Sequence, residues 1–155
     1  MRYKVEGLGE FEAAKPVSEL KKAKPSIGSI VNAASRAEGD KRYDEAKEIF
    51  EVGLEFYPEN AGILNNFAWF LVTVKDAKRR DPQRAVGLAR KAVKLTQGQA
   101  GYILDTLAEA LYQAGSLEEA VEQAEKAARL DPDEEIRERA ERFRKELDAR
   151  PQRGE

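Results

Sequence analysis

Residues 61–74 read A-G-I-L-N-N-F-A-W-F-L-V-T-V, the most apolar segment from which a helix can be predicted in this chain. Apolar side chains would occupy almost every side of a helix formed by it, and such a helix must be covered on several sides. The stretch is too short to cross a bilayer, which takes about 20 apolar residues. We therefore predict that it is the middle helix of a stack of helices. Its few polar residues, Asn65, Asn66 and Thr73, share one stripe with Trp69, and this stripe points to a binding module.

The composition narrows the class of protein. The chain has 155 residues, enough for one domain. Charged residues make up 36% of it, but the net charge is only -2 and the isoelectric point is near 5.5. Nucleic-acid-binding domains usually carry a basic stripe and a high isoelectric point, so we expect no nucleic-acid partner. The chain lacks cysteine and histidine, which excludes disulfides and thiol nucleophiles and removes the commonest general base and metal ligand.

The start of the chain carries no targeting signal that we can identify. No apolar run follows residues 1–6, so we expect neither a signal peptide nor contact with a membrane. The lack of cysteine suits the cytoplasm and the periplasm alike, and we expect a cytoplasmic protein.

Small and apolar residues recur along the chain in the same order. They follow an anchor alanine by one and two helical turns, and a proline stands after the helix in the clearest copies. The anchors are Ala14, Ala46, Ala85 and Ala120, at spacings of 32, 39 and 35 residues. Self-similarity at such a period is typical of stacked helical repeats.

These residues resemble the tetratricopeptide repeat, a helix-turn-helix unit of about 34 residues. The clearest copy has the family's signature residues in order, namely Leu104, Leu107, Ala108, Leu111, Gly115, Leu117, Ala120, Ala127 and Pro132. Residues 61–97 match too, with about five extra residues between their helices, and residues 27–58 match well in their second helix and loosely in their first. The resemblance therefore covers roughly residues 25–132. It implies an all-α fold, an α-α superhelix of about three helical hairpins with a C-terminal capping helix.

On this interpretation the chain has three parts. Residues 1–24 form an N-terminal arm or a degenerate half-repeat, residues 25–150 form the repeat domain, and residues 151–155 are a frayed tail. In the half-repeat alternative Pro16 would lie inside a helix, at a cost of about 3 kcal/mol. In the other alternative a loose segment precedes a short helix that starts at Pro16.

The last helix, residues 133–150, has the pattern of a cap. One narrow apolar stripe is surrounded by charge, and it consists of Ile136, Ala140, Phe143 and Leu147. A repeat stack needs such a helix at its end, where one face is buried and the others meet water. We expect ion pairs one turn apart along this helix, among them Glu135 with Arg139.

Local motifs agree with the repeat. Ser116 and Glu119 form the pattern of a capping box, and Asp81-Pro82 has the pattern of an N-cap followed by the first helical residue. Residues 75–80 resemble the long loop between the helices of a bacterial variant of the repeat. Their basic side chains either grip a phosphate or an acidic partner or form a solvated loop with Arg80 paired to a carboxylate.

In the repeats that this sequence resembles, the first helix of each pair lines the concave face. The resemblance therefore implies a peptide-binding set on that face, consisting of Asn32, Asn65, Asn66, Trp69, Thr73, Tyr102, Asp105, Thr106, Glu109, Tyr112 and Gln113. Asparagine amides both donate to and accept from a peptide backbone, and aromatic residues are common binding hot spots. Asp105 and Glu109 lie one turn apart and make this part of the face acidic, so we expect a basic or neutral partner.

Four of these residues also have a structural alternative. Trp69 would only plug the gap to the next helix, Asn66 would tie repeats together, and Asp105 and Glu109 would be solvated charges. Some family members clamp a carboxylate with basic side chains at positions where this chain has Tyr102 and Thr106. We therefore expect no carboxylate clamp.

The function that we expect is a non-catalytic protein-protein interaction scaffold that holds a peptide or helical segment in its concave groove. The sequence has no glycine-rich phosphate loop and no metal-ligand spacing, and we expect no enzyme activity, metal or cofactor. The alternative is a structural or self-assembly module. Its groove would be filled by its own N-terminal arm, by another copy in a homo-oligomer, or by neighbouring repeats of a longer chain.

Overall fold

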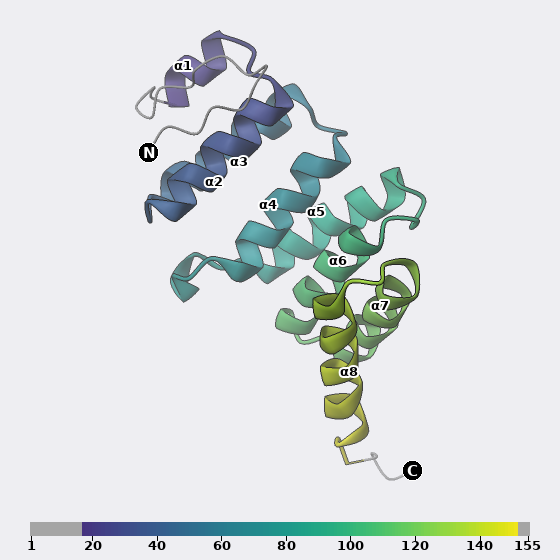
Figure 1. Ribbon diagram of the computed structural model, residues 1–155. Helices are drawn as coiled ribbons and strands as arrows, with labels where there is room; N and C mark the ends of the chain where they lie inside the picture. Colours follow the sequence, from purple (N-terminus) through teal and green to yellow (C-terminus); the bar gives the residue numbers. More distant parts are fainter. Residues whose placement is uncertain (1–16, 152–155) are drawn as a thin grey trace. The chain divides into compact units, whose positions relative to one another are not determined.

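The computed structural model describes residues 17–151, and the elements in this range are helices (Figure 1). No strand occurs among these residues, which confirms the all-α class. Residues 1–16 and 152–155 lie outside the described part, and with them most of the expected arm and tail. No helix in the described range is both long and apolar enough to cross a membrane. The cytoplasmic location stays a prediction.

The chain divides into two compact units, one ending at Ile63 and the other beginning at Leu64. Helix α4, Ala61–Thr73, starts in the first unit and continues in the second. The repeat domain expected over residues 25–150 stays a prediction.

The first unit is built on a helical hairpin, with α2 at Ile27–Gly39 and α3 at Tyr43–Phe56. The short helix α1, Val17–Lys22, packs on α3 (Figure 1). The two helices of the hairpin approach closely at Gly53, because a Cβ atom there would lie 2.8 Å from the Ile30 side chain.

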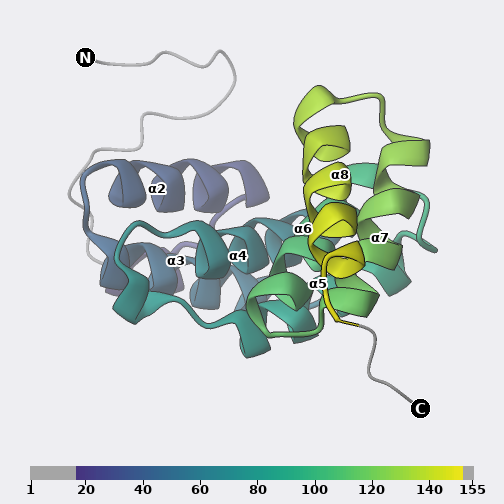
Figure 2. The same ribbon diagram turned by 90° about the horizontal axis from the view of Figure 1, so that it is seen from below.

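The second unit continues from α4 with four helices, which are α5 at Pro82–Leu95, α6 at Gly101–Gln113, α7 at Leu117–Leu130 and α8 at Glu134–Asp148. Each packs on the next along the chain, and Figure 2 shows this succession from a second side. The repeated alanines let the helices approach closely, since those of α5 and α7 are fully buried, namely Ala85, Ala89, Ala92, Ala120, Ala124 and Ala127.

Two predicted helix starts have different outcomes. Asp81 is the N-cap of α5 and accepts a hydrogen bond from the Arg84 backbone N-H at 3.0 Å, which confirms the Asp81-Pro82 prediction. The capping box at Ser116 is wrong, because this residue makes no side-chain capping bond. Glu119 instead accepts from Arg90 of α5 at 2.8 Å, since an opposite charge on a neighbouring helix attracts it more than its own helix start does.

The loop between α4 and α5 contains a short 3-10 helix, Ala77–Arg79. The expected ion pair of Arg80 with a carboxylate is wrong. Arg80 donates from Nε to the Val74 carbonyl at 3.0 Å, and the nearby Asp76 carboxylate accepts from Arg79 instead. Arg80 thus ties the loop to the end of α4 through a backbone acceptor.

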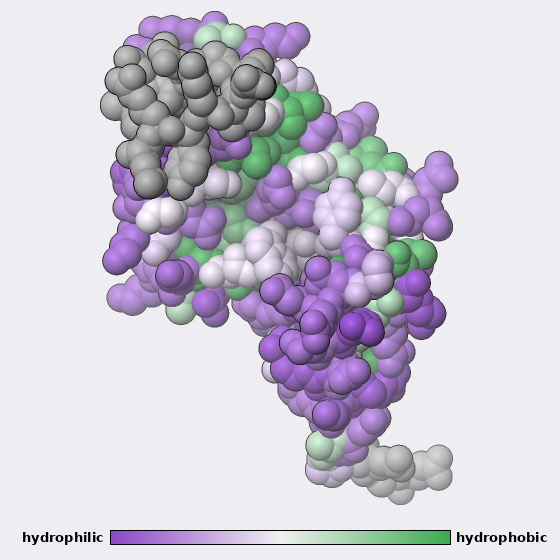
Figure 3. Space-filling view, in the orientation of Figure 1, coloured by the Kyte–Doolittle hydropathy of each residue, from purple (hydrophilic) through white to green (hydrophobic). Residues whose placement is uncertain are grey.

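The expected cap is confirmed as helix α8. Asp133 is its N-cap and accepts from the backbone N-H groups of Glu135 and Ile136. Ile136, Ala140 and Phe143 are buried along one stripe. The outer sides are hydrophilic, and Figure 3 shows them as the mostly purple surface near the C-terminal end. This helix therefore ends the second unit with one buried face, as a cap requires.

Candidate binding site

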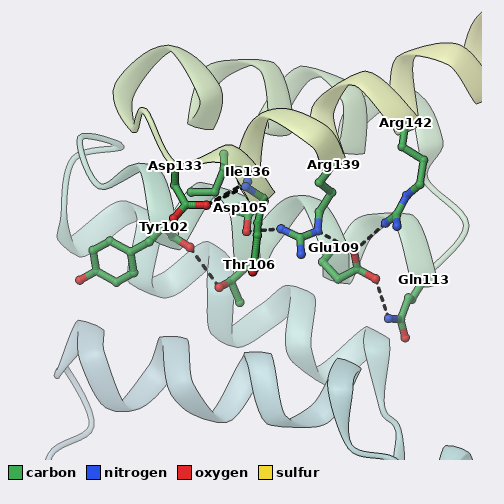
Figure 4. A network of polar contacts seen from close by, with 10 residues as sticks. Tyr102, Asp105, Thr106, Glu109, Gln113, Asp133, Ile136, Arg139 and Arg142 are labelled. Atoms are coloured by element: carbon green, nitrogen blue, oxygen red, sulfur yellow. Dashed lines mark hydrogen bonds and ion pairs between the residues drawn. The ribbon is translucent and has the colours of Figure 1, made fainter.

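Arg139 of α8 reaches two carboxylates of α6 (Figure 4). Its Nη1 donates to Asp105 Oδ2, and its Nε donates to Glu109 Oε2 at 3.1 Å. The side chains of Arg139, Asp105 and Glu109 are only 15%, 9% and 12% exposed. The alternative that Asp105 and Glu109 are solvated charges is therefore wrong.

The same contacts correct a second expectation. Arg139 does not form the predicted pair with Glu135, an exposed residue one turn earlier on its own helix. Carboxylates in a drier environment interact more strongly with a guanidinium group than an exposed carboxylate does, because water screens them less. Arg139 therefore links α8 to α6.

Glu109 has a second set of partners. Its Oε1 accepts from Gln113 Nε2 at 2.8 Å, and Arg142 Nη2 lies 3.5 Å from its Oε2 (Figure 4). Gln113 Nε2 also donates to the Val72 carbonyl at 2.8 Å, so it links the end of α4 to α6. Glu109 is therefore neutralised from α8 and held in place from its own helix.

Trp69 belongs to the same cluster. The Arg139 guanidinium carbon lies 5.2 Å from the centroid of the Trp69 ring, within the range of a cation-π interaction. Trp69 is half-buried on α4. Residues of α4, α6 and α8 thus meet on one side of the second unit, and we name this side the α4–α6–α8 face, defined by Trp69, Tyr102, Asp105, Glu109 and Arg139.

Tyr112 serves to dock the cap. Its ring stacks on Phe143 of α8 with centroids 4.3 Å apart and an interplanar angle of 13°. Its hydroxyl donates to Glu146 Oε2 at 2.8 Å. This hydrogen bond, with a smaller effect of burial, raises the pKa of the Tyr112 phenol. Tyr112 therefore holds α6 and α8 together, and its predicted contact with a ligand stays a prediction.

The other predicted residues differ in accessibility. Tyr102 is 53% exposed, and Asn66 is half-buried. Thr73 and Thr106 each donate to a carbonyl one turn earlier in their own helix. Asn32 is exposed on α2, in the unit that ends at Ile63.

Two buried acceptors on this side of the unit have no hydrogen-bond partner, Asn65 Oδ1 and Asp105 Oδ1. Both residues are only 7% exposed. Burial raises the pKa of the Asp105 carboxyl group, and the hydrogen bond from Arg139 offsets part of that effect. The second oxygen of Asp105 is thus desolvated without compensation.

Replacing Asp105 by asparagine should remove a pH-dependent loss of stability. Because the folded pKa is raised, the folded state binds this proton more tightly than the unfolded chain does. The resulting stabilisation is fully present below the unfolded pKa, near 3.8, and is lost as the pH rises through the folded pKa. In urea titrations at increasing pH, the unfolding free energy of the wild-type chain should fall relative to that of Asp105→Asn between the unfolded and the folded pKa of Asp105. A difference that stays constant with pH would contradict this expectation.

The sequence did not identify Arg139 and Arg142 as parts of this site. Each of them is one of many charged residues on this helix, and the charge pattern of the helix predicts a solvated surface. No signal in the sequence separates the arginine that turns toward α6 from those that face water.

No group of three or more acidic side chains in the described part of the chain is arranged to hold a metal ion.

Comparisons with known proteins agree with the helical arrangement. Residues 101–134 match the family model of the tetratricopeptide repeat. No curated protein matches the chain. A solved structure of the first TPR of Spaghetti (RPAP3), bound to the HSP90 peptide SRMEEVD, is similar with a TM-score of 0.67 and 20% identity, over 77% of this chain and 91% of that chain.

A mutant of MamA is similar with a TM-score of 0.54 and 21% identity, over 74% of this chain and 82% of that chain. At such low sequence identities, the similarity to these structures supports only the fold. The comparisons identify a tetratricopeptide repeat fold, with the sequence signature of the repeat itself in α6 and α7.

Proposed function

We propose that the chain is a non-catalytic protein-interaction scaffold that binds a peptide or helical segment along the α4–α6–α8 face. The observation that carries this proposal is Tyr102, a ring 53% exposed that lies one turn before the Asp105 carboxylate on the same helix. A half-exposed aromatic ring next to polar groups is typical of a binding hot spot. The similar TPR of Spaghetti was solved with a bound peptide, which supports a peptide as the ligand.

The chemistry of this face favours a basic or neutral partner. The peptide bound by Spaghetti contains three acidic side chains in SRMEEVD. Here Asp105 and Glu109 would repel such a segment, although Arg139 and Arg142 partly neutralise them. We therefore propose a partner without an acidic cluster, in keeping with the expectation that Tyr102 and Thr106 form no carboxylate clamp. We also propose that residues 75–80 mark the bacterial variant of the repeat.

A second candidate is a structural or self-assembly module. It is favoured because two of the predicted ligand-binding residues already contact other parts of the same chain. Tyr112 binds α8, and Gln113 binds α4. A stable dimer or polymer in solution would support this candidate over a free binding face.

Selection of peptides from a displayed library on the full chain tests the first candidate. Tyr102→Ala should lower the affinity of the chain for the selected peptides by about tenfold or more, as the loss of an aromatic hot spot does. Leu95→Ala is the matched control, because Leu95 is an exposed apolar residue of α5, a helix that does not contribute to the proposed face. We expect it to change binding by less than about twofold. Failure to select any peptide, or equal losses in both variants, would overturn the proposal.

A further inference from the structure

The cluster around Arg139 has the composition of a guanidinium receptor. The Asp105 and Glu109 carboxylates accept from two different nitrogens of one guanidinium group, and Trp69 offers a ring face 5.2 Å from its carbon. A planar guanidinium uses such a combination better than an ammonium group does, because its fork of donors matches carboxylates and its plane stacks on aromatic rings.

Arg139 does not use the full capacity of this receptor. It engages one oxygen of Asp105 and leaves Oδ1 buried without a partner. Among the described residues its own Nη2 has no acceptor. A side chain that starts from α8 must reach both carboxylates from one direction, whereas a side chain arriving from outside can pair with both oxygens of one carboxylate.

Asn65 gives a second, independent indication. Its Oδ1 is also buried without a partner, and Asn65 is only 7% exposed. It precedes Trp69 by one turn on α4, so the two side chains lie on the same side of that helix. A buried acceptor without a partner, one turn from Trp69 on the same helix, adds unused hydrogen-bonding capacity to this part of α4.

We propose that Asp105, Glu109 and Trp69 form a receptor for a guanidinium group, which Arg139 fills in the free chain and an arginine side chain of the bound segment fills in the complex. This inference rests on the proposed function and names the residue type that recognition requires. The complementary charge of the two carboxylates selects a basic side chain, and the ring selects arginine over lysine.

The exchange does not require α8 to leave the unit. Ile136 and Phe143 hold α8 in the core, and the Phe143 ring also stacks on Tyr112. Arg139 contacts the two carboxylates through its side chain alone, so rotation about its side-chain bonds can release the guanidinium group while the backbone of α8 stays in place. Arg142 stays near Glu109 and is already 61% exposed.

The test uses the full chain with Arg139→Ala, and N-acetylarginine amide as the probe. This variant empties the receptor, so the probe should bind and change the fluorescence of Trp69, the only tryptophan in the chain. We expect binding at least about tenfold stronger than that of N-acetyllysine amide. Wild type should bind the arginine probe more weakly by a similar factor, because Arg139 competes at a high effective concentration.

Two further variants complete the experiment. Arg139→Ala with Asp105→Asn should lose about tenfold in affinity for the arginine probe, because one carboxylate is gone. Arg137→Ala removes an exposed arginine from the same helix and should behave as wild type. The inference is overturned if Arg139→Ala binds the arginine and lysine probes equally, or binds neither.

A measurement on the wild-type chain covers the case in which Arg139→Ala does not fold. The Nε-H signal of Arg139 in nuclear magnetic resonance reports its bond to Glu109. Added N-acetylarginine amide at high concentration should shift this signal toward that of a free arginine, whereas the lysine probe should not. A signal that neither probe moves would overturn the inference.

The two proposals fail in different ways. Peptides selected from the library that bind equally well after their arginines are changed to lysine leave the scaffold function in place and overturn the guanidinium receptor. Specific binding of the arginine probe, without any selected peptide, supports the receptor and overturns the scaffold function.

Discussion

Replacing Phe143 by alanine should lower the free energy of unfolding of the second unit by about 4 kcal/mol, as expected for a buried phenylalanine. Its side chain is fully buried, and its ring stacks on Tyr112 of α6. The substitution removes this stack and leaves a cavity under the cap, which the helices cannot close without breaking other contacts. Urea unfolding followed by the fluorescence of Trp69 measures the change, because Trp69 lies in this unit.

The control for this prediction is Phe143→Leu, which keeps most of the apolar volume. We expect it to lose less than half as much stability, because a smaller cavity forms. Arg137→Ala on the exposed side of α8 should change the unfolding free energy by less than about 0.5 kcal/mol. Equal stabilities of wild type and Phe143→Ala would show that the docking of α8 contributes nothing to the unit.

Replacing Arg139 by alanine should lower the unfolding free energy at pH 7 by about 3 kcal/mol, the effect of removing one partner from a buried ion pair. The loss comes from Asp105 and Glu109, which are then left mostly buried without their main cation. Arg142 compensates only in part, because it approaches Glu109 at 3.5 Å and is itself 61% exposed.

A double-mutant cycle separates the ion pair from simple packing. Adding Asp105→Asn to Arg139→Ala removes one uncompensated charge and should restore about 1 kcal/mol or more. The same Asp105→Asn change in the wild-type background should not stabilise to that extent, because it breaks the pair. If the effects of the two substitutions on the unfolding free energy were strictly additive, the ion-pair explanation would be contradicted. The loss would then come from the packing of the Arg139 side chain.

The helical stack was predictable because packing imposes a regular requirement at every repeat. Ala85, Ala120 and the residues two turns after them are small because adjacent helices approach closely there, and the residues between them show the same period. Residues 61–74 identify the covered helix in the same way, and α8 has the single apolar stripe of a cap.

The α6 part of the candidate site was predictable for a related reason. Tyr102, Asp105 and Glu109 follow each other at helical spacing, so they must lie on the same side of α6 once that helix forms. Whether any of them contacts a ligand stays a prediction.

The partners of the charged side chains were not predictable. Glu119 matches a capping box, yet it pairs with Arg90 of α5, and Arg139 matches a pair with Glu135, yet it contacts Asp105 and Glu109 of α6. Rules for helix capping and for ion pairs within a helix consider only residues that are close in sequence. A long, flexible side chain also reaches partners that the fold brings close, and the drier partner attracts it more strongly.

The helices, their order and their buried faces follow from the sequence alone, because hydrophobic burial depends on the period of apolar residues and requires no knowledge of distant partners. Two features became visible only in the packed helices. Asp105 and Glu109 of α6 pair with an arginine of the capping helix, and Tyr112 and Gln113 join α6 to its neighbouring helices. These contacts join residues from different helices, and their strength depends on distance and burial, which exist only once the helices have packed.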